Sequence, residues 1–133
     1  MKVFVNLTST VTDDSHAIDT LPKSRVTGML KKDGPMLRLS FPLDGKMQTL
    51  IFDDKNKGVL ELRRENGYML FDRQTTTEGL YKVEHFSLLP KIKTHRLSNG
   101  ITEKGGKLIL DYTLDFEGEK QHFHMEIEVK PAL

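Results

Sequence analysis

Side chains that commonly bind metal ions recur at every second position near the end of the chain, at His122, His124 and Glu126. Alternate positions share one face of a β-strand, and Asp111 lies on the strand expected to pair with this one. Imidazole and carboxylate groups gathered on one face are typical ligands of zinc or another divalent cation. The alternative is a solvated face on which these charges only pair with one another. The sequence therefore predicts a candidate metal site at His122, His124, Asp111 and Glu126.

A second group of residues is basic. Lys91, Lys93 and His95 alternate along one expected strand, while Arg63 ends an earlier one and Arg64 follows it. With nearby aromatic rings, such a surface would suit single-stranded nucleic acid, whose bases stack on aromatic side chains. The alternative is the polar outer face of a strand. The 20 basic and 19 acidic residues give a net charge of only +1, which provides no general attraction for phosphate. Nucleic-acid binding at Arg63, Lys91, Lys93 and His95 is thus a less favoured but open interpretation.

Motifs that would indicate an enzyme are absent from the sequence. No serine lies in a Gly-x-Ser-x-Gly motif. Gly105-Gly106 precedes an expected strand rather than a helix, unlike a phosphate-binding loop. The chain has no cysteine, which excludes thiolate nucleophiles, zinc–thiolate sites and iron–sulfur clusters. We therefore expect a non-catalytic protein with no cofactor.

Cysteine usage and the N-terminal residues bear on the compartment. A small secreted domain often depends on disulfides, so their absence favours a reducing environment. Asn6 and the hydroxyl residues after it interrupt any apolar signal-peptide region. No stretch reaches the length of a transmembrane helix. These features predict a cytoplasmic protein that does not enter the membrane.

Apolar and polar residues alternate along much of the chain, and this period of two residues is typical of strands rather than helices. The alternation predicts the elements that position the residues above. The expected strands are residues 3–12, 25–32, 36–41, 47–53, 59–63, 68–71, 91–95, 108–116 and 122–129. Residues 78–89 form either a helix or two short strands, of which strands are favoured, and residues 13–23 are expected to form a loop. Gly28 suggests a bulge or bend within its strand. Asn66-Gly67 predicts a hairpin with a type I′ turn.

The final two strands are expected to form a hairpin. A two-residue loop at Gly118-Glu119 would pair Tyr112 with Met125 and Asp111 with Glu126. Every apolar side chain of the two strands then lies on one face. A slip by one residue would move these side chains to the polar face, so the faces are well determined.

About eight to ten strands joined by tight turns predict an all-β fold, a small antiparallel up-and-down β-barrel with at most a short helical segment. One domain over residues 1–133 is expected. The second half also resembles a known family, in the runs Tyr81-Lys82-Val83, Leu88, Ile92, Thr94, Gly106–Leu114 and Gln121–Ile127. Over roughly residues 79–129 the chain is similar to the YwiB-like family of bacterial proteins, whose function is unknown. The resemblance implies a calycin-like (lipocalin-like) barrel and supplies no functional residue; Phe86 departs from it, near a place where the family tends to carry glycine.

A barrel of this kind would gather apolar side chains inside. The candidate ligand-binding residues on the inner face are Leu110, Tyr112, Leu114, Phe123, Met125 and Ile127. They favour a small apolar or amphipathic ligand held in the barrel or at its mouth. The alternative is an interior that side chains fill completely. A non-catalytic binding module is the leading interpretation. An RNA- or protein-interaction surface and a metal site are the alternatives, and the oligomeric state is left open.

Overall fold

The computed structural model describes the backbone of residues 1–13 and 18–132 and the side chains of residues 1–12 and 23–132. Over this part of the chain the regular elements are all strands, and no helix that could cross a membrane is present. The strands are β1 (Lys2–Asp13), β2 (Ile18–Asp33), β3 (Met36–Leu43), β4 (Lys46–Asp53), β5 (Asn56–Arg64), β6 (Gly67–Asp72), β7 (Thr77–Glu78), β8 (Leu80–Val83), β9 (Phe86–Leu88), β10 (Lys91–Asn99), β11 (Gly106–Phe116) and β12 (Glu119–Pro131).

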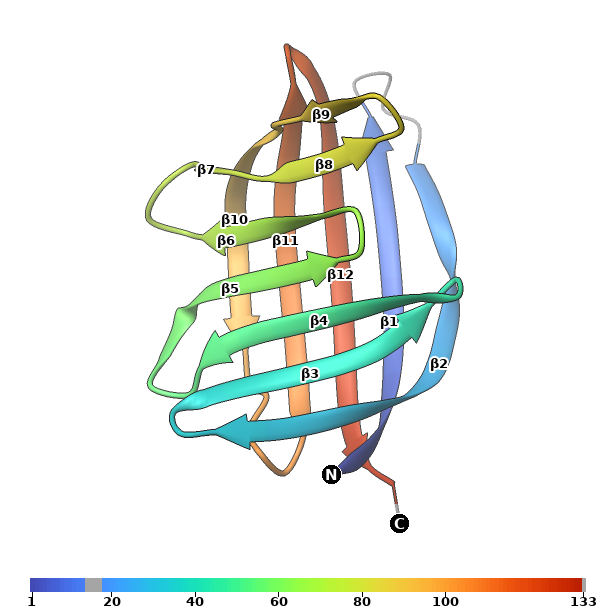
Figure 1. Cartoon of the computed structure of the whole chain (residues 1–133), viewed down its shortest axis with the longest axis vertical. Helices are drawn as coiled ribbons and strands as arrows, with labels where there is room; N and C mark the ends of the chain where they lie inside the picture. The colour runs from blue at the N-terminus through green and yellow to red at the C-terminus, as the bar shows by residue number, and fades with distance from the viewer. Residues whose placement is uncertain (14–17, 133) are drawn as a thin grey trace.

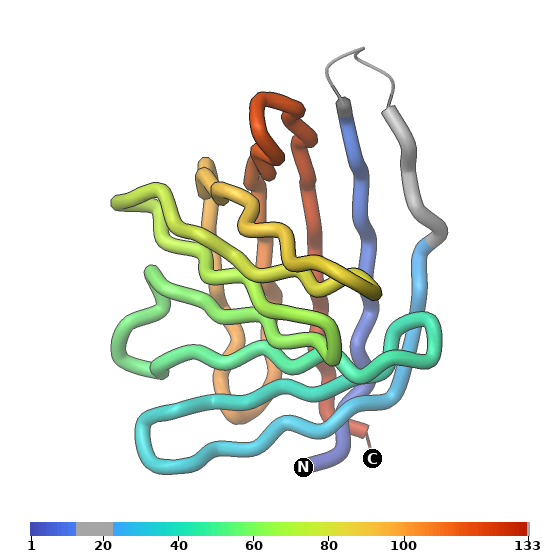
Figure 2. The backbone as a smooth tube through the Cα atoms, turned by 45° about the horizontal axis from the view of Figure 1, so that its top comes forward, coloured from blue at the N-terminus to red at the C-terminus, as the bar shows by residue number. Residues whose placement is uncertain are grey.

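The strands of the described chain belong to one antiparallel sheet of twelve, in the order β7-β10-β11-β12-β1-β2-β3-β4-β5-β6-β8-β9. Most neighbours in this order are consecutive in the chain, and β1 pairs with β12. Figure 1 shows β10, β11, β12 and β1 running upright, with β3 to β6 crossing in front of them. Figure 2 shows the same two layers facing each other from a second angle. The sheet therefore curls over itself as a partly open barrel, which confirms the predicted fold class.

Strand β2 passes from one layer to the other (Figure 1). It pairs with β1 up to Met29 and with β3 from Met29 onward. At Gly28 a Cβ atom would lie 2.5 Å from the backbone oxygen of Ser40. Only glycine allows this close approach, and Gly28 lies where β2 passes from its pairing with β1 to its pairing with β3.

The loop predicted over residues 13–23 is wrong for residues 18–23, which begin β2. Asp13 ends β1, and residues 14–17 lie outside the described residues. Pro22 suggested a loop because proline removes a donor from the ladder. The ladder between β1 and β2 shifts its register between Leu7 and Ser9, opposite this proline. Proline is tolerated at such an irregularity, and pairing with β1 therefore outweighs the local signal.

The C-terminal hairpin has the predicted faces but not the predicted register. Tyr112 pairs with Phe123 and Asp111 with His124, so each partner lies two residues earlier than expected. The turn is Glu117-Gly118, with φ angles of 53° and 95°. A type I′ turn needs positive φ at both central residues and favours glycine at the second, whereas the prediction placed glycine first. A shift of two residues leaves the inner face unchanged.

The hairpin predicted at Asn66-Gly67 is present, but its turn lies one residue earlier, because Arg64 pairs with Gly67. Gly67 has a different role. A Cβ atom there would lie 1.8 Å from the backbone oxygen of Leu80 on β8. The missing side chain therefore lets β8 lie against β6, and Gly67 is paired directly with Tyr81.

Residues 78–89 form short strands rather than a helix, as favoured from the sequence. These short elements raise the number of strands in the described chain to twelve, above the eight to ten expected. Phe86 begins β9 directly after a turn and is 62% exposed. Together, β8 and β9 extend the front layer toward one end of the barrel (Figure 1).

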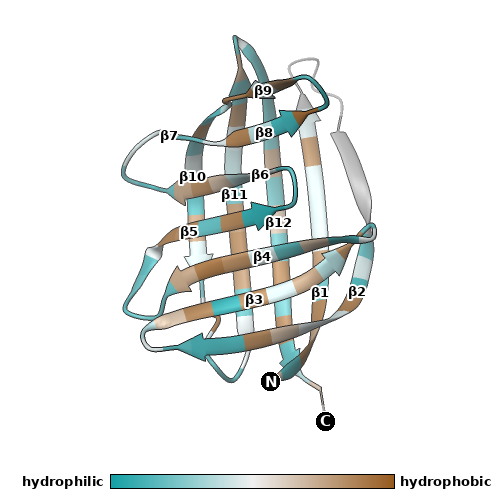
Figure 3. Cartoon of the chain, in the orientation of Figure 1, coloured by the Kyte–Doolittle hydropathy of each residue, from teal (hydrophilic) through white to brown (hydrophobic). Residues whose placement is uncertain are grey.

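The core fills the end of the barrel away from β8 and β9. Figure 3 shows hydrophobic and hydrophilic residues alternating along the strands, which places one apolar face of each strand inside. The largest side chains that are less than 2% exposed are Phe52, Phe71, Leu37, Leu39, Leu50, Leu60, Ile92, Ile101, Leu108, Leu110, Ile127 and Val3. Burial of each large apolar side chain contributes roughly 1.5–3 kcal/mol. This packed core lies inside the barrel next to the candidate site.

Candidate functional site

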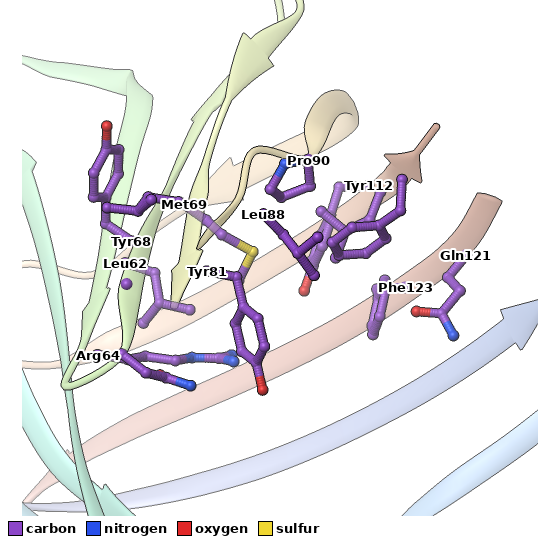
Figure 4. Close-up of a pocket in the computed structure, with 15 residues that line it drawn as sticks. Leu62, Arg64, Tyr68, Met69, Tyr81, Leu88, Pro90, Tyr112, Gln121 and Phe123 are labelled. Atoms are coloured by element: carbon purple, nitrogen blue, oxygen red, sulfur yellow. The ribbon is translucent and has the colours of Figure 1, made fainter. Parts of the chain in front are cut away.

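Two adjoining hollows lie between the layers of the barrel, the smaller beside β8 and β9 and the larger between the β3–β4 hairpin and strands β1 and β12, and we call them together the mouth cavity. The smaller has a volume of about 190 Å³ and the larger of about 400 Å³. Both are lined by Leu62, Arg64, Asn66, Tyr81, Tyr112 and Phe123. Figure 4 shows residues of the front strands on one side of the smaller hollow and residues of β11 and β12 on the other.

Stacked aromatic rings form one wall of the mouth cavity. The Tyr112 and Phe123 rings lie 4.9 Å apart between centroids and are nearly parallel, at 7°. Their stacking follows from the ladder, because these residues are directly opposed on β11 and β12. Phe71 also packs against Tyr112, with the ring centroids 4.7 Å apart and the rings tilted by 59°. These contacts hold the wall in one position.

Arg64 brings a positive charge to the edge of this cavity. It follows Leu60 and Leu62 at every second position of β5, so its side chain begins on their face of the strand, and at this strand end it is exposed. Of the side chains that the structure describes, it is the only charged one that lines the smaller hollow. The ion pairs found among the described residues all involve other groups. The guanidinium is therefore available to a ligand.

The Tyr112 hydroxyl stays neutral at ordinary pH. Burial raises the pKa of Tyr112 to about 12, and the positive charge of Arg64 acts in the opposite direction. A neutral phenol keeps its proton and can donate a hydrogen bond. The mouth cavity thus combines apolar walls with a cation and a phenol donor.

A separate outer groove of about 650 Å³ runs over β7, β10, β11 and β12. It brings together Lys91, Lys93 and His95, three of the four residues predicted for nucleic acid. Arg63 lies elsewhere and forms an ion pair with Glu61, at 2.9 Å. The residues that line the groove are Thr76, Thr77, Glu78, Lys91, Lys93, His95, Thr113, Asp115, Lys120 and His122.

The residues predicted to bind a metal are divided between two hydrogen-bonded groups. The His122 ring nitrogen Nδ1 lies 2.6 Å from the Thr113 hydroxyl. His124 instead contacts Asp111 through Nδ1 and lies 3.5 Å from Glu126 through Nε2. The hydrogen bond to Asp111 raises the pKa of His124. Among the described side chains, no group of three or more potential ligands is arranged to hold a metal ion.

Comparison with known proteins shows which family the chain belongs to. The chain matches the model of a domain of unknown function, DUF1934, over residues 5–127. The chain belongs to the DUF1934 family. The crystal structure of the ywiB protein from Bacillus subtilis has the same fold as this DUF1934 chain, with a TM-score of 0.77, at 17% identity over 98% of this chain and 92% of that one. The predicted YwiB-like resemblance is confirmed, and the family match extends well before residue 79. No curated protein matches the chain.

Most of the ligand-binding residues predicted from the sequence line the mouth cavity of the DUF1934 chain. Tyr112 and Phe123 line both hollows, Leu114 lines the smaller, and Met125 and Ile127 line the larger. Leu110 lies in the packed core, where it is 1% exposed.

Four residues that line both hollows of the DUF1934 chain were missed as cavity residues: Leu62, Arg64, Asn66 and Tyr81. The sequence interpretation grouped Arg64 with Arg63 on one basic surface, but neighbouring positions of a strand point to opposite faces. The alternation of Leu60, Leu62 and Arg64 carried the signal that Arg64 points inward.

Proposed function

We propose that this DUF1934 protein is a non-catalytic binding module that takes a small amphipathic ligand into its mouth cavity. The observation that supports this most is the smaller hollow, which has mostly apolar walls and few polar groups and opens beside a larger hollow of mixed lining. Sites for small molecules are concave and mostly apolar, with a few polar groups that orient the ligand. Within the described part of the chain, no carboxylate, imidazole or serine lines the smaller hollow, which supports binding rather than catalysis.

The fold and the composition support the same proposal. Small barrels commonly hold ligands in the interior or at the mouth. On this basis we propose a relationship to calycin-like (lipocalin-like) barrels. The chain has no cysteine, which suits a reducing compartment, so we propose that it acts in the cytoplasm.

The proposal is tested with N-phenyl-1-naphthylamine, an uncharged probe whose fluorescence rises in apolar surroundings. We expect saturable binding by the wild-type protein. Met125 is partly buried and lines the larger hollow, so Met125→Trp should fill part of the cavity. This variant should weaken probe binding at least about ten-fold, or about 1.4 kcal/mol.

The control is the same substitution at an exposed methionine. Met29 is 54% exposed on β2, and Met29→Trp should bind the probe like the wild type. Circular dichroism establishes that both variants are folded. The proposal is rejected if the wild type shows no saturable binding, or if folded Met125→Trp and Met29→Trp bind alike.

A second candidate function is the binding of single-stranded RNA in the outer groove. It is supported by the gathering of Lys91, Lys93 and His95 in one concave surface. We expect that changing Lys91 and Lys93 together to glutamate abolishes binding of an oligouridylate measured by fluorescence anisotropy. Wild-type affinity should also fall steeply between about 50 and 200 mM salt. The matched control changes the exposed Lys31 and Lys32 of β2 in the same way; an equal loss in both double variants rejects a specific role of the groove.

A further inference from the structure

Resting on the binding function proposed above, we propose that Arg64 selects the ligand, and that the ligand of the mouth cavity is an amphipathic molecule with a carboxylate head. The apolar tail lies against Tyr112, Phe123 and their neighbours, and the head lies at the guanidinium. Arg64 is here a specificity-determining residue of a non-catalytic site.

The position of Arg64 supports this assignment. It is the last residue of β5 and lies on the same face as Leu62, so its side chain begins at the edge of the apolar lining. Figure 4 shows Arg64 and Tyr81 extending into the same space from the front strands. Both residues line both hollows. A head group at Arg64 therefore has access to either hollow for its tail.

The charges around the mouth cavity favour an anion. Among the described side chains, the smaller hollow is lined by one cation and no acid. The larger one adds Asp44 and Lys46, whose formal charges cancel, so Arg64 leaves a net positive charge among the described residues there as well. An amine head would be repelled by this charge, and an alcohol would leave it unpaired.

The kind of donor favours a carboxylate. The planar guanidinium offers parallel N–H donors that match the two oxygens of a carboxylate. Tyr112 retains its phenolic proton, since burial raises its pKa to about 12, and it lines the same hollow as Arg64. One cation and one neutral donor suit a monoanion better than a phosphate dianion, which usually recruits several charged donors.

The test compares decanoate, 1-decanol and decylamine, which share one chain length and differ in the head group. Each is titrated against N-phenyl-1-naphthylamine bound to the protein at pH 7, where the acid is ionised. We expect decanoate to bind at least about ten-fold more tightly than decanol, because a charged hydrogen bond is stronger than a neutral one. Decylamine should bind most weakly.

Arg64→Met removes the charge and keeps a long, flexible side chain. It should weaken decanoate about ten-fold or more and leave decanol within about two-fold. Arg63→Met is the matched control, because Arg63 lies on the outer face and pairs with Glu61. Arg64→Lys retains the positive charge but lacks the parallel N–H donors of the guanidinium, so this variant should still bind decanoate more tightly than decylamine. It serves as a second variant if Arg64→Met does not fold.

The outcomes separate this inference from the function on which it rests. If decanoate and decanol bind the wild type equally, or if Arg63→Met is as damaging as Arg64→Met, the carboxylate assignment is overturned and the binding function stands. If the probe and all three ligands fail to bind, the binding function fails and the inference fails with it.

Discussion

Replacing Thr94 by valine should stabilise the barrel. Thr94 pairs with Tyr112 on the inner face, is 6% exposed, and its hydroxyl has no hydrogen-bond partner among the described residues. An unsatisfied buried hydroxyl costs about 1–3 kcal/mol, and valine replaces it with a methyl group in nearly the same volume. We expect the lower end of this range, a gain of about 1 kcal/mol in the free energy of unfolding. For a domain of this size the gain corresponds to about 4 °C in Tm.

The matched control is Thr113→Val on the neighbouring strand. Thr113 is similarly buried, at 7% exposed, but its hydroxyl lies 2.7 Å from His95 Nε2 and 2.6 Å from His122 Nδ1. The same substitution there should destabilise the protein by about 1 kcal/mol, because two hydrogen bonds are lost. Urea unfolding followed by circular dichroism measures both changes. The reasoning is refuted if Thr94→Val loses stability, or if both variants shift in the same direction.

The remaining predictions concern backbone contacts and titration. Gly67→Ala should lower the free energy of unfolding by at least about 2 kcal/mol, because its Cβ would lie 1.8 Å from the Leu80 backbone oxygen. The control is Gly58→Ala, whose Cβ would meet only a side-chain atom at 3.5 Å. It should change the free energy of unfolding by less than about 0.5 kcal/mol in the same urea assay. Equal costs would contradict this prediction. Asp111→Asn should lower the pKa of His124 toward about 6.5, measured by NMR titration of its ring, because the hydrogen bond to Asp111 raises that pKa. The raised pKa stabilises the fold below about pH 6.5 and this contribution is lost as the pH rises through the folded-state value; it is below about 1 kcal/mol, since the pair is largely solvated. An unchanged titration would show that Asp111 is not the cause.

The sequence predicted the inner and outer faces of the strands, because the side-chain period of a strand is two residues. Val3 and Val5 at one end of the chain and Leu108 at the other all lie in the core. The same period could not determine the register of the last hairpin, since a shift of two residues keeps every face. That register depends on which turn position glycine occupies, and Glu117-Gly118 places it second.

The sequence predicted the aromatic wall of the candidate site but missed Arg64 and Tyr81, which line the site as well. Tyr112 and Phe123 follow the inner pattern and line both hollows. Arg64 also follows that pattern, but a charged residue at a strand end was assigned to the surface. Tyr81 reaches the cavity because β8 lies against β6 at Gly67, a contact between strands that local sequence does not specify.

The pairing of β1 with β12 has a consequence for how the molecule assembles. Val3 is opposite Pro131, so the seam that joins the two halves of the sheet connects residues almost a whole chain apart. Closing such a distant contact is entropically costly and slows folding. During synthesis β1 carries an unsatisfied edge until β12 emerges, and an unpaired strand edge invites association with other chains. Because β1 supplies the partner for both β2 and β12, its second edge is paired only once β12, which follows the other eleven strands of the described chain, has formed.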